Sequence, residues 1–333
     1  MTLLDRLAGL PLTVEAVRLE RRQVQVNGFT RVTTTLVLEG DGRSGEGEDV
    51  SWDPVDHDRF PELPLIGRRT LAEWSELLEG RDLYARAPSN EAARDYRRWA
   101  FESAALDLAL RQAGSSFAEA LGRVARPVRF VVSAGGPIEH WLALNPDLEF
   151  KLDAASDWDA ARLERLAASG RVRVVDMKAH YEGDWRPSRP DPVLHRAVAQ
   201  ALPEAIIEDP RLEGDFAEAL RGAEGRVSFD APIHSLADVD ALPLELRWLN
   251  VKPSRFGTVA RLLECVEACE RRGIRMYGGG QFELGPGRRQ IQTLAAVFYA
   301  DGPNDVAPAA YNLGGPRPGL PTSPLPAPTE AGF

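Results

Sequence analysis

The feature that most constrains the fold is the alternation of short apolar runs and helical stretches that begins after Pro127. Strand-like runs recur there at intervals of about 22 residues, with amphipathic segments between them. This rhythm is typical of βα units, in which helices join parallel strands and cover the sheet. We therefore predict an α/β fold with eight strands, near residues 128–133, 148–152, 172–178, 204–208, 226–230, 247–252, 274–278 and 306.

Charged residues close four of these runs. Asp176, Glu208 and Asp230 each end an apolar run, and Lys252 ends the next one. The intervals between these positions are each compatible with one βα step. Because the carboxyl ends of parallel strands meet at one mouth of the sheet, we expect the four side chains to share a cavity. A single acid after a strand is usually a helix cap, but four separate caps would not explain four strand ends in register.

The part of the chain before Pro127 has a different pattern. Residues 13–50 alternate in polarity and are rich in β-branched side chains, which predicts a small antiparallel sheet with a turn at Gly40-Asp41-Gly42. A strong helix is expected across Ala92–Ala113. Its stripe of small residues suits close helix packing, and comprises Ala100, Ala104, Ala105, Leu108 and Ala109.

Composition narrows the class of function. The formal net charge is −10 and no cluster of lysine and arginine offsets it, which argues against a nucleic-acid partner. No apolar stretch approaches the roughly 18 residues of a membrane span, and the start lacks a secretory signal. The only cysteines, Cys265 and Cys269, lie one helical turn apart without further metal ligands nearby, which favours reduced thiols. We predict a cytoplasmic protein that acts on a small molecule.

Four short motifs, in order and at intervals that span most of the chain, resemble the enolase superfamily, specifically its muconate-lactonising and o-succinylbenzoate-synthase-like branch. They are residues 101–110 (FESAALDLAL), 208–210 (EDP), 250–257 (NVKPSRFG) and 279–288 (GGQFELGPGR). The resemblance implies an N-terminal α+β capping domain over residues 1–125. It implies a modified TIM barrel, (β/α)7β, over residues 126–305, and a C-terminal segment, 306–333, that packs back toward the capping domain.

The same resemblance implies a metal and a chemistry. Members of the superfamily remove a proton next to a carboxylate through a metal-stabilised enediolate. By resemblance, Asp176, Glu208 and Asp230 are ligands of Mg²⁺, with Mn²⁺ as an alternative, because hard carboxylate oxygens suit these ions. Lys252 is then the catalytic base that faces a small carboxylate substrate. Taken alone, Lys252 would be interpreted as a strand-end lysine paired with a nearby acid.

The chain departs from the family pattern on two strands. The second strand normally ends in two lysines separated by one residue, but here it reads Lys151-Leu152-Asp153. Two residues after the first metal ligand the family has asparagine, whereas this chain has Lys178. One hypothesis is that Lys178, on the same strand face as Asp176, replaces the missing lysine as a second catalytic residue and pairs with Asp153. The other is that Lys178 only neutralises the acids of a degenerate site.

Three more residues are candidates for substrate contact or for support of the site. Lys151 either tunes the charge at the mouth or forms a structural ion pair. Glu283 either contacts substrate or a lysine, or is a buried acid hydrogen-bonded to backbone. The glycines around Gly280 allow the backbone to approach the cavity closely.

The leading functional prediction is a lyase, a dehydratase of the o-succinylbenzoate synthase kind, suggested by the run Lys252-Pro253-Ser254-Arg255. Cycloisomerase and epimerase activities are alternatives, and racemisation is disfavoured because one usual lysine is absent. An alternative from another class is a catalytically degenerate binding protein of the superfamily, without turnover. The sequence does not identify the substrate, and it leaves homo-oligomerisation open.

Overall fold

The structure, a computed structural model, describes residues 1–26, 28–134, 137–181 and 189–333. Its N-terminal part contains the predicted antiparallel sheet, in the order β2 (Ala16–Val26), β3 (Phe29–Gly40) and β4 (Arg43–Asp49). The predicted turn joins β3 to β4, where Gly40 pairs with Arg43. The other elements of this part are α1 (Leu3–Leu7), β1 (Pro11–Val14), the 3₁₀ helix Pro54–His57, β5 (Gly67–Thr70), α2 (Leu71–Leu78) and α4 (Phe117–Ala120), with β1 and β5 paired.

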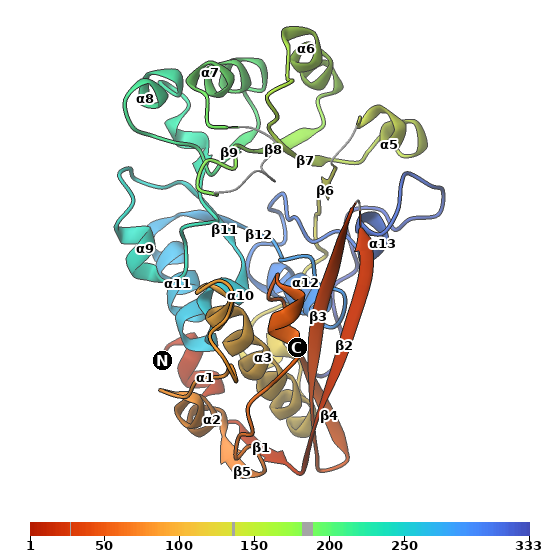
Figure 1. Ribbon diagram of the computed structural model, residues 1–333, viewed down its shortest axis with the longest axis vertical. Coiled ribbons are helices and arrows are strands. Elements are labelled where there is room, and N and C mark those ends of the chain that lie inside the picture. The colour runs from red at the N-terminus through yellow and green to blue at the C-terminus, as the bar shows by residue number, and fades with distance from the viewer. Residues whose placement is uncertain (27, 135–136, 182–188) are drawn as a thin grey trace.

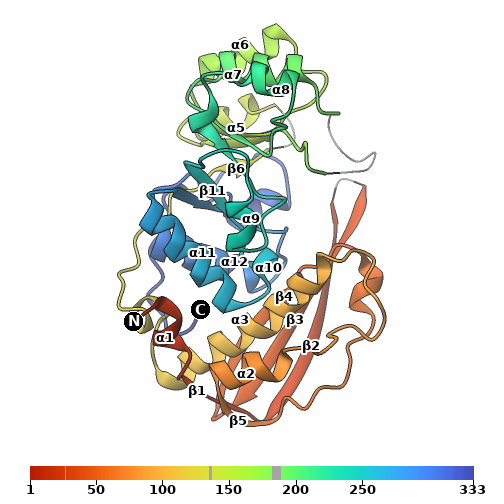
Figure 2. The same cartoon turned by 90° about the vertical axis from the view of Figure 1, so that its left-hand side faces the viewer.

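The long helix α3 (Ala93–Ala113) lies against this sheet at close range (Figure 2). A Cβ atom at Gly47 would lie 2.0 Å from the carbonyl oxygen of Ala100, and one at Gly45 would lie 2.2 Å from the backbone nitrogen of Leu108. Glycine is therefore required on β4 for the helix to approach. The predicted stripe of small residues on α3 is buried, which confirms its role in packing.

The second part contains the predicted parallel strands. A five-stranded parallel sheet runs in chain order through β6 (Val132–Ser133), β7 (Phe150–Asp153), β8 (Val172–Asp176), β9 (Ile206–Glu208) and β10 (Val227–Ser228), and β11 (Trp248–Val251) pairs in parallel with β12 (Arg275–Gly278). The helices between and after them are α5 (Glu139–Leu144), α6 (Ala160–Ser169), α7 (Pro192–Ala201), α8 (Asp215–Ala219), α9 (Leu236–Asp240), α10 (Pro253–Phe256), α11 (Val259–Arg272), α12 (Gly287–Phe298) and α13 (Ala309–Asn312), with a 3₁₀ turn at Glu224–Arg226 (Figure 1).

Among the described residues these strands form two sheets and not one continuous closed sheet. Single hydrogen bonds link the sheets in the order expected of a barrel: Asn250 N donates to Phe229 O (3.2 Å), Asp305 N to Gly278 O (2.8 Å) and Val131 N to Asn304 O (2.8 Å). The strand predicted near 306 is reduced to a bridge between Phe130 and Asn304. The strand predicted over 172–178 ends at Asp176, because the backbone turns left-handed two residues later.

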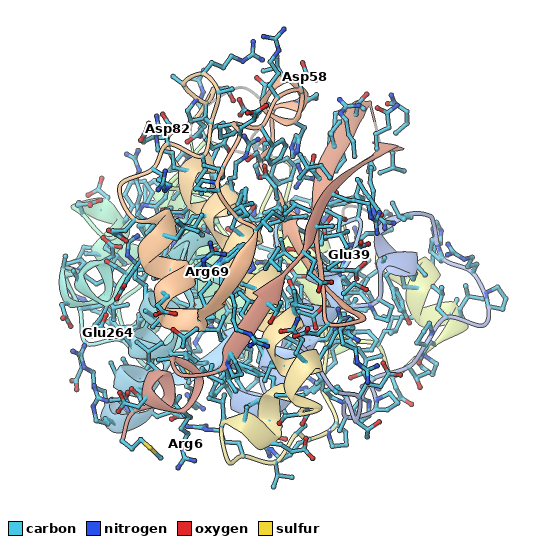
Figure 3. All side chains as sticks on the ribbon, turned by 90° about the horizontal axis from the view of Figure 1, so that it is seen from below. Arg6, Glu39, Asp58, Arg69, Asp82 and Glu264 are labelled. Atoms are coloured by element: carbon cyan, nitrogen blue, oxygen red, sulfur yellow. The ribbon has the colours of Figure 1, made fainter. Side chains whose placement is uncertain are left out.

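The C-terminal residue Phe333 returns to the N-terminal part. Its ring is buried against those of Phe117 and Trp99, at 4.8 and 6.1 Å between centroids, and its backbone nitrogen donates to the carboxylate of Asp107 on α3 (2.7 Å). The outer face of the N-terminal part carries side chains of both signs, among them Arg69 and Asp58 (Figure 3). Within the described ranges, no helix combines the length and the apolar character needed to span a bilayer.

Candidate active site

The strand ends bring buried carboxylates together. Asp176 closes β8, Glu208 closes β9 and Asp209 follows directly, and all three are inaccessible to solvent. One oxygen from each of them lies within 4.8 Å of the other two. Parallel strands in register place Asp176 opposite Glu208, which explains the convergence. Asp209 was not among the predicted site residues, although it belongs to the 208–210 motif.

Each acid predicted as a metal ligand is paired with a lysine. Lys151 Nζ lies 2.5 Å from Glu208 Oε1, and Lys178 Nζ lies 2.5 Å from Asp176 Oδ2. Lys252 Nζ lies 2.5 Å from Asp230 Oδ2. Asp176 and Glu208 thus lie together with Lys178 and Lys151, and Asp230 forms a separate pair with Lys252.

These three lysines are the only ones in the chain, whereas arginine occurs 37 times. An ordinary surface cation is therefore an arginine in this protein, and lysine is confined to the strand-end cluster. An arginine cannot lose its proton in a protein, while a lysine can. The scarcity of lysine could have pointed to the site from the sequence, but we predicted the site from the residues at strand ends.

Asp230 lies beside two cations and outside the group of three acids. Arg255 Nε lies 2.9 Å from its Oδ1, in addition to Lys252 on Oδ2. Burial opposes ionisation, yet Arg255 and Lys252 together lower the pKa of Asp230. Arg255 Nη2 also donates to the hydroxyl of Tyr181 (2.9 Å). Neither Arg255 nor Tyr181 was predicted as a site residue.

Asp209 supports the loop that carries Asp230. Its carboxylate accepts hydrogen bonds from the backbone nitrogens of Asp230 (2.8 Å) and Ala231 (3.1 Å). Burial and the neighbouring carboxylates of Asp230 and Asp176 raise the pKa of Asp209 well above its ordinary value. The site therefore contains surplus negative charge that a cation would relieve.

Glu208 is held by three donors. Besides Lys151, the hydroxyl of Tyr277 on β12 donates to Oε2 (2.6 Å), as does Asn250 Nδ2 on β11 (3.1 Å). Tyr277 and Asn250 were missed in the sequence, but strand periodicity contains the signal. Asn250 is two residues before Lys252, and residues two apart on a strand face the same side.

Lys178 connects β7 and β8. Its Nζ lies 2.5 Å from Asp176 Oδ2 and 3.4 Å from Asp153 Oδ1, so the hypothesised pair with Asp153 is present. Its backbone has φ of 51°, a left-handed value that is uncommon outside glycine. Burial opposes protonation, but the carboxylates of Asp176 and Asp153 raise the pKa of Lys178 well above its ordinary value. Its ammonium group also lies 5.2 Å from the centre of the Tyr181 ring.

Glu283 and Gly280 lie on the segment that follows β12. Glu283 Oε1 accepts from the backbone nitrogen of Gln281 (2.6 Å), and Oε2 lies 3.1 Å from Arg288 Nη2. This is the geometry of the buried, backbone-bonded acid, one of the two interpretations open from sequence. A Cβ atom at Gly280 would lie 2.3 Å from a Glu283 oxygen, so glycine is required there.

The cluster fits a divalent cation by its donors and by its charge. Its ligand atoms are carboxylate oxygens, which Mg²⁺ prefers. Six carboxylates face four cations, which gives the network a formal net charge of −2; its members are Asp153, Asp176, Glu208, Asp209, Asp230 and Asp305 with Lys151, Lys178, Lys252 and Arg255. One Mg²⁺ would bring that charge to zero.

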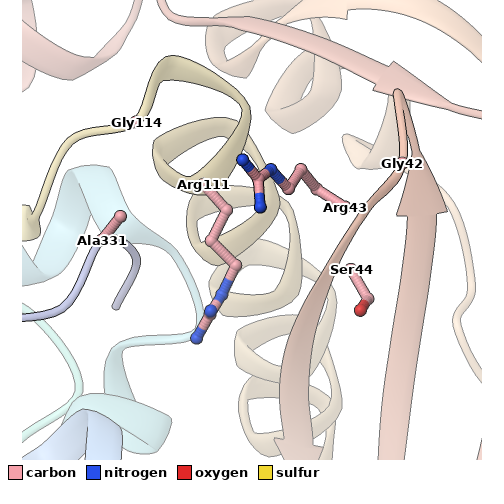
Figure 4. Close-up of a pocket in the computed structure, with 6 residues that line it drawn as sticks. All are labelled: Gly42, Arg43, Ser44, Arg111, Gly114 and Ala331. Carbon is pink, nitrogen blue, oxygen red and sulfur yellow. The ribbon is translucent and has the colours of Figure 1, made fainter.

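A separate cavity of about 280 Å³ lies at the other end of the molecule, between the β3–β4 turn, the end of α3 and the C-terminal segment (Figure 4). Arg43, Ser44 and Arg111 line it together with Gly42, Gly114 and Ala331. None of these residues belongs to the strand-end cluster.

Family models match both parts of the chain. Residues 5–120 match the N-terminal domain, and residues 124–313 the C-terminal domain, of a family described as domain of unknown function DUF8230. A protein named N-succinylamino acid racemase from Amycolatopsis is 30% identical over 215 residues, 60% of this chain and 56% of that protein, so the match spans little more than half of it. A protein of the same name from Thermus thermophilus is 26% identical over 326 residues, 84% of this chain and 79% of that protein.

Solved structures of the enolase superfamily share the fold. The dipeptide epimerase of Methylococcus capsulatus, solved with Mg and the dipeptide L-Arg-D-Lys, has a TM-score of 0.67 at 20% identity over 91% of this chain and 92% of that one. The proteins named in these comparisons include a racemase, an epimerase and a cycloisomerase, and the solved structures share the fold that the resemblance predicted. The chain belongs to the DUF8230 family, and its fold is that of the enolase superfamily.

Proposed function

We propose that the protein is a Mg²⁺-dependent enzyme that removes the proton α to the carboxylate of a small substrate. The observation that carries the proposal is that all three lysines of the chain converge on one buried carboxylate cluster. If the three lysines were distributed by chance among the 40 cationic positions of the chain, they would not all lie on or just after the strands that carry this cluster, β7, β8 and β11. A cluster that needed charge alone would be served by arginine.

The fold that we propose for this chemistry is the (β/α)7β barrel of residues 126–305, capped by residues 1–125 and closed by residues 306–333. The linking hydrogen bonds around the sheet support it. The contacts of Phe333 with Phe117 and Trp99 support the return of the C-terminal segment to the cap.

Asp176, Glu208 and Asp230 are the proposed metal ligands, with Asp209 as the alternative third ligand because it lies closer to the first two. Bound there, Mg²⁺ would supply positive charge for the substrate carboxylate and for the negative charge that develops on proton removal. Mn²⁺ suits the same oxygen donors. Tyr277 and Asn250 would keep Glu208 oriented toward the ion.

Lys252 and Lys178 are the proposed proton carriers. They pair with acids at the two ends of the cluster in strand order, Asp230 after β10 and Asp176 on β8. Lys252 is the proposed base that removes the α-proton. Asp176 and Asp153 keep Lys178 protonated, which suits a proton donor. Asp153 acts on the substrate only through Lys178.

A second lysine changes the preferred outcome of the reaction. The sequence disfavoured racemisation because the second-strand lysine is absent, but Lys178 supplies an amine from the neighbouring strand. Two lysines can exchange a proton at one carbon, and both curated relatives are named racemases. We therefore favour racemisation or epimerisation of an N-acylated amino acid, with the predicted dehydration as the second candidate.

Isotope exchange tests the proposal. The protein is incubated in ²H₂O with each enantiomer of several N-succinylamino acids and with a succinylbenzoate-type dehydration substrate, with Mg²⁺ or with EDTA. We expect Mg²⁺-dependent deuterium at the α-carbon, lost in Lys252→Arg, which keeps the charge but cannot act as a base. Binding of these acids without exchange, measured by calorimetry, would instead identify the degenerate binding protein.

A further inference from the structure

Two buried charged residues of the N-terminal sheet hold the segment that follows β12. Arg31 on β3 is fully buried, and no carboxylate among the described residues lies within ion-pair distance of it. Among the residues that the structure describes, its guanidinium donates only to backbone carbonyls. Two of them belong to the far segment: Nη2 donates to Gln281 O (2.7 Å) and Nε to Phe282 O (3.2 Å).

The remaining donors of Arg31 stay within its own part of the chain. They reach the carbonyls of Val32 (3.0 Å), Val50 (2.8 Å) and Ser51 (2.6 Å). The ring of Trp52 covers the guanidinium at 4.3 Å. Arg31 is therefore fixed on the cap side and presents a rigid pair of donors to residues 281 and 282.

Glu48 on β4 holds the same segment with the opposite charge. Its carboxylate accepts from the backbone nitrogens of Leu284 (2.7 Å), Gly285 (2.9 Å) and Gly287 (2.9 Å), where α12 begins. The first backbone N–H groups of a helix have no partner within it, and a carboxylate satisfies them. Arg31 thus binds the carbonyl groups, and Glu48 the N–H groups, of the segment 281–287.

This segment touches the proposed base. A Cβ atom at Gly279 would lie 2.9 Å from Lys252 Cε and 2.9 Å from Asn250 Oδ1, so the backbone packs directly on the lysine side chain. Phe282 has φ of 60°, a left-handed conformation that is unfavourable for an aromatic residue. Such a conformation persists only where contacts hold it, and Arg31 bonds its carbonyl.

We infer that Arg31 is a positioning residue of the active site, which acts through the carbonyls of Gln281 and Phe282 to hold residues 279–283 against Lys252. The part of this inference that concerns catalysis rests on the proposed function. Arginine is required because one planar guanidinium group donates hydrogen bonds to five carbonyl oxygens, which belong to two parts of the chain. A lysine ammonium has only three N–H donors on a single nitrogen, so it cannot bond all five carbonyl oxygens.

The test compares Arg31→Met and Arg31→Lys with a matched control, Arg97→Met. Arg97 is an equally buried guanidinium of the same part of the chain, bonded to the Asp49 carboxylate and to carbonyls that include that of Leu83, without a hydrogen bond to residues 279–287. We expect both Arg31 variants to lower kcat for α-proton exchange by about 10–100-fold, with KM changed much less, because small displacements of a reacting group have such effects. Arg97→Met is expected to lower stability without this separation of kcat from KM.

Two readouts do not depend on catalysis. Backbone amide exchange at Leu284, Gly285 and Gly287 should accelerate in the Arg31 variants and not in Arg97→Met. The reactivity of Lys252 toward an amine reagent, followed by mass spectrometry, should change as well, and only three lysines and the N-terminus compete for the label. If the wild type shows no proton exchange, the proposed function fails while these readouts still test the positioning. Unchanged amide exchange and Lys252 reactivity in folded Arg31 variants would overturn the inference, as would kcat losses equal to those of Arg97→Met.

Discussion

Replacing Lys178 separates the two roles that the site allows for it. Lys178→Met keeps the length of the side chain and removes its charge. Breaking a buried ion pair costs about 3–5 kcal/mol when one partner remains charged. We expect the lower end, about 3 kcal/mol, because Asp176 keeps Lys151 at 3.7 Å and the backbone N–H of Lys178 at 2.9 Å. Urea unfolding in EDTA measures this loss.

Magnesium should offset part of that loss. Without Lys178 the network carries one more negative charge, so the affinity for Mg²⁺ should rise, and an ion at 100 times its Kd stabilises the folded state by about 2.7 kcal/mol. Proton exchange should still fall by about 10²–10⁴-fold, the usual contribution of a general acid or base. Higher Mg²⁺ affinity with normal exchange would support the neutralising role instead.

Lys178→Arg is the matched control, because it keeps the charge and cannot transfer a proton at neutral pH. If Lys178 carries protons, this variant remains stable and loses exchange. If Lys178 only neutralises Asp176, the arginine variant exchanges like the wild type. Wild-type turnover in Lys178→Arg would refute the proposed proton transfer.

Three further predictions concern the hydrogen bond of Tyr277 to Glu208, the metal, and two buried histidines. Tyr277→Phe removes a hydrogen bond to ionised Glu208, so it should lower the unfolding free energy by about 1.5–3 kcal/mol and Mg²⁺ affinity by about 10–100-fold; calorimetric titration with unchanged affinity would contradict this. Saturating Mg²⁺ should raise the melting temperature and EDTA should reverse the rise, whereas calcium, which prefers more ligands, should stabilise less; equal melting curves would exclude the site. Burial lowers the pKa of His57 and of His195, so the unfolded chain binds protons first as pH falls below about 6.5, and the unfolding free energy should decrease there. Urea titrations at pH 7 and 5.5 check this, and His57→Gln should reduce the slope.

The sequence predicted the main elements because their signals are local. The alternation of apolar runs placed the strands that end at Asp176 and Glu208, and the small-residue stripe of α3 identified its packing face. The length of the eighth strand was not predictable, because its pairing reduces to the bridge between Phe130 and Asn304. Such pairing depends on contacts between distant parts of the chain, which periodicity does not contain.

The sequence predicted which strand ends carry the candidate site, but it did not predict the arrangement of the side chains within the site. Asp176 and Glu208 lie together, as the parallel register requires, and Lys252 pairs with Asp230. The sequence could not show that Asp209 approaches the first two acids more closely than Asp230 does. That outcome depends on the left-handed backbone of Asp209, with φ of 49°, a conformation that no pattern of residue types specifies.

The departure from the family pattern at Lys178 is best explained as a lysine moved from one strand to the next. Asp153 and Asp176 are direct neighbours in the register of β7 and β8. Lys178 reaches both carboxylates from a left-handed backbone conformation, which costs on the order of 1–2 kcal/mol for a residue with a Cβ atom. A lysine that merely neutralised charge could use a relaxed backbone or an arginine, as every other cation in the chain does outside the cluster. A costly conformation held by two acids instead indicates that the position of this one amine matters, as proton transfer requires.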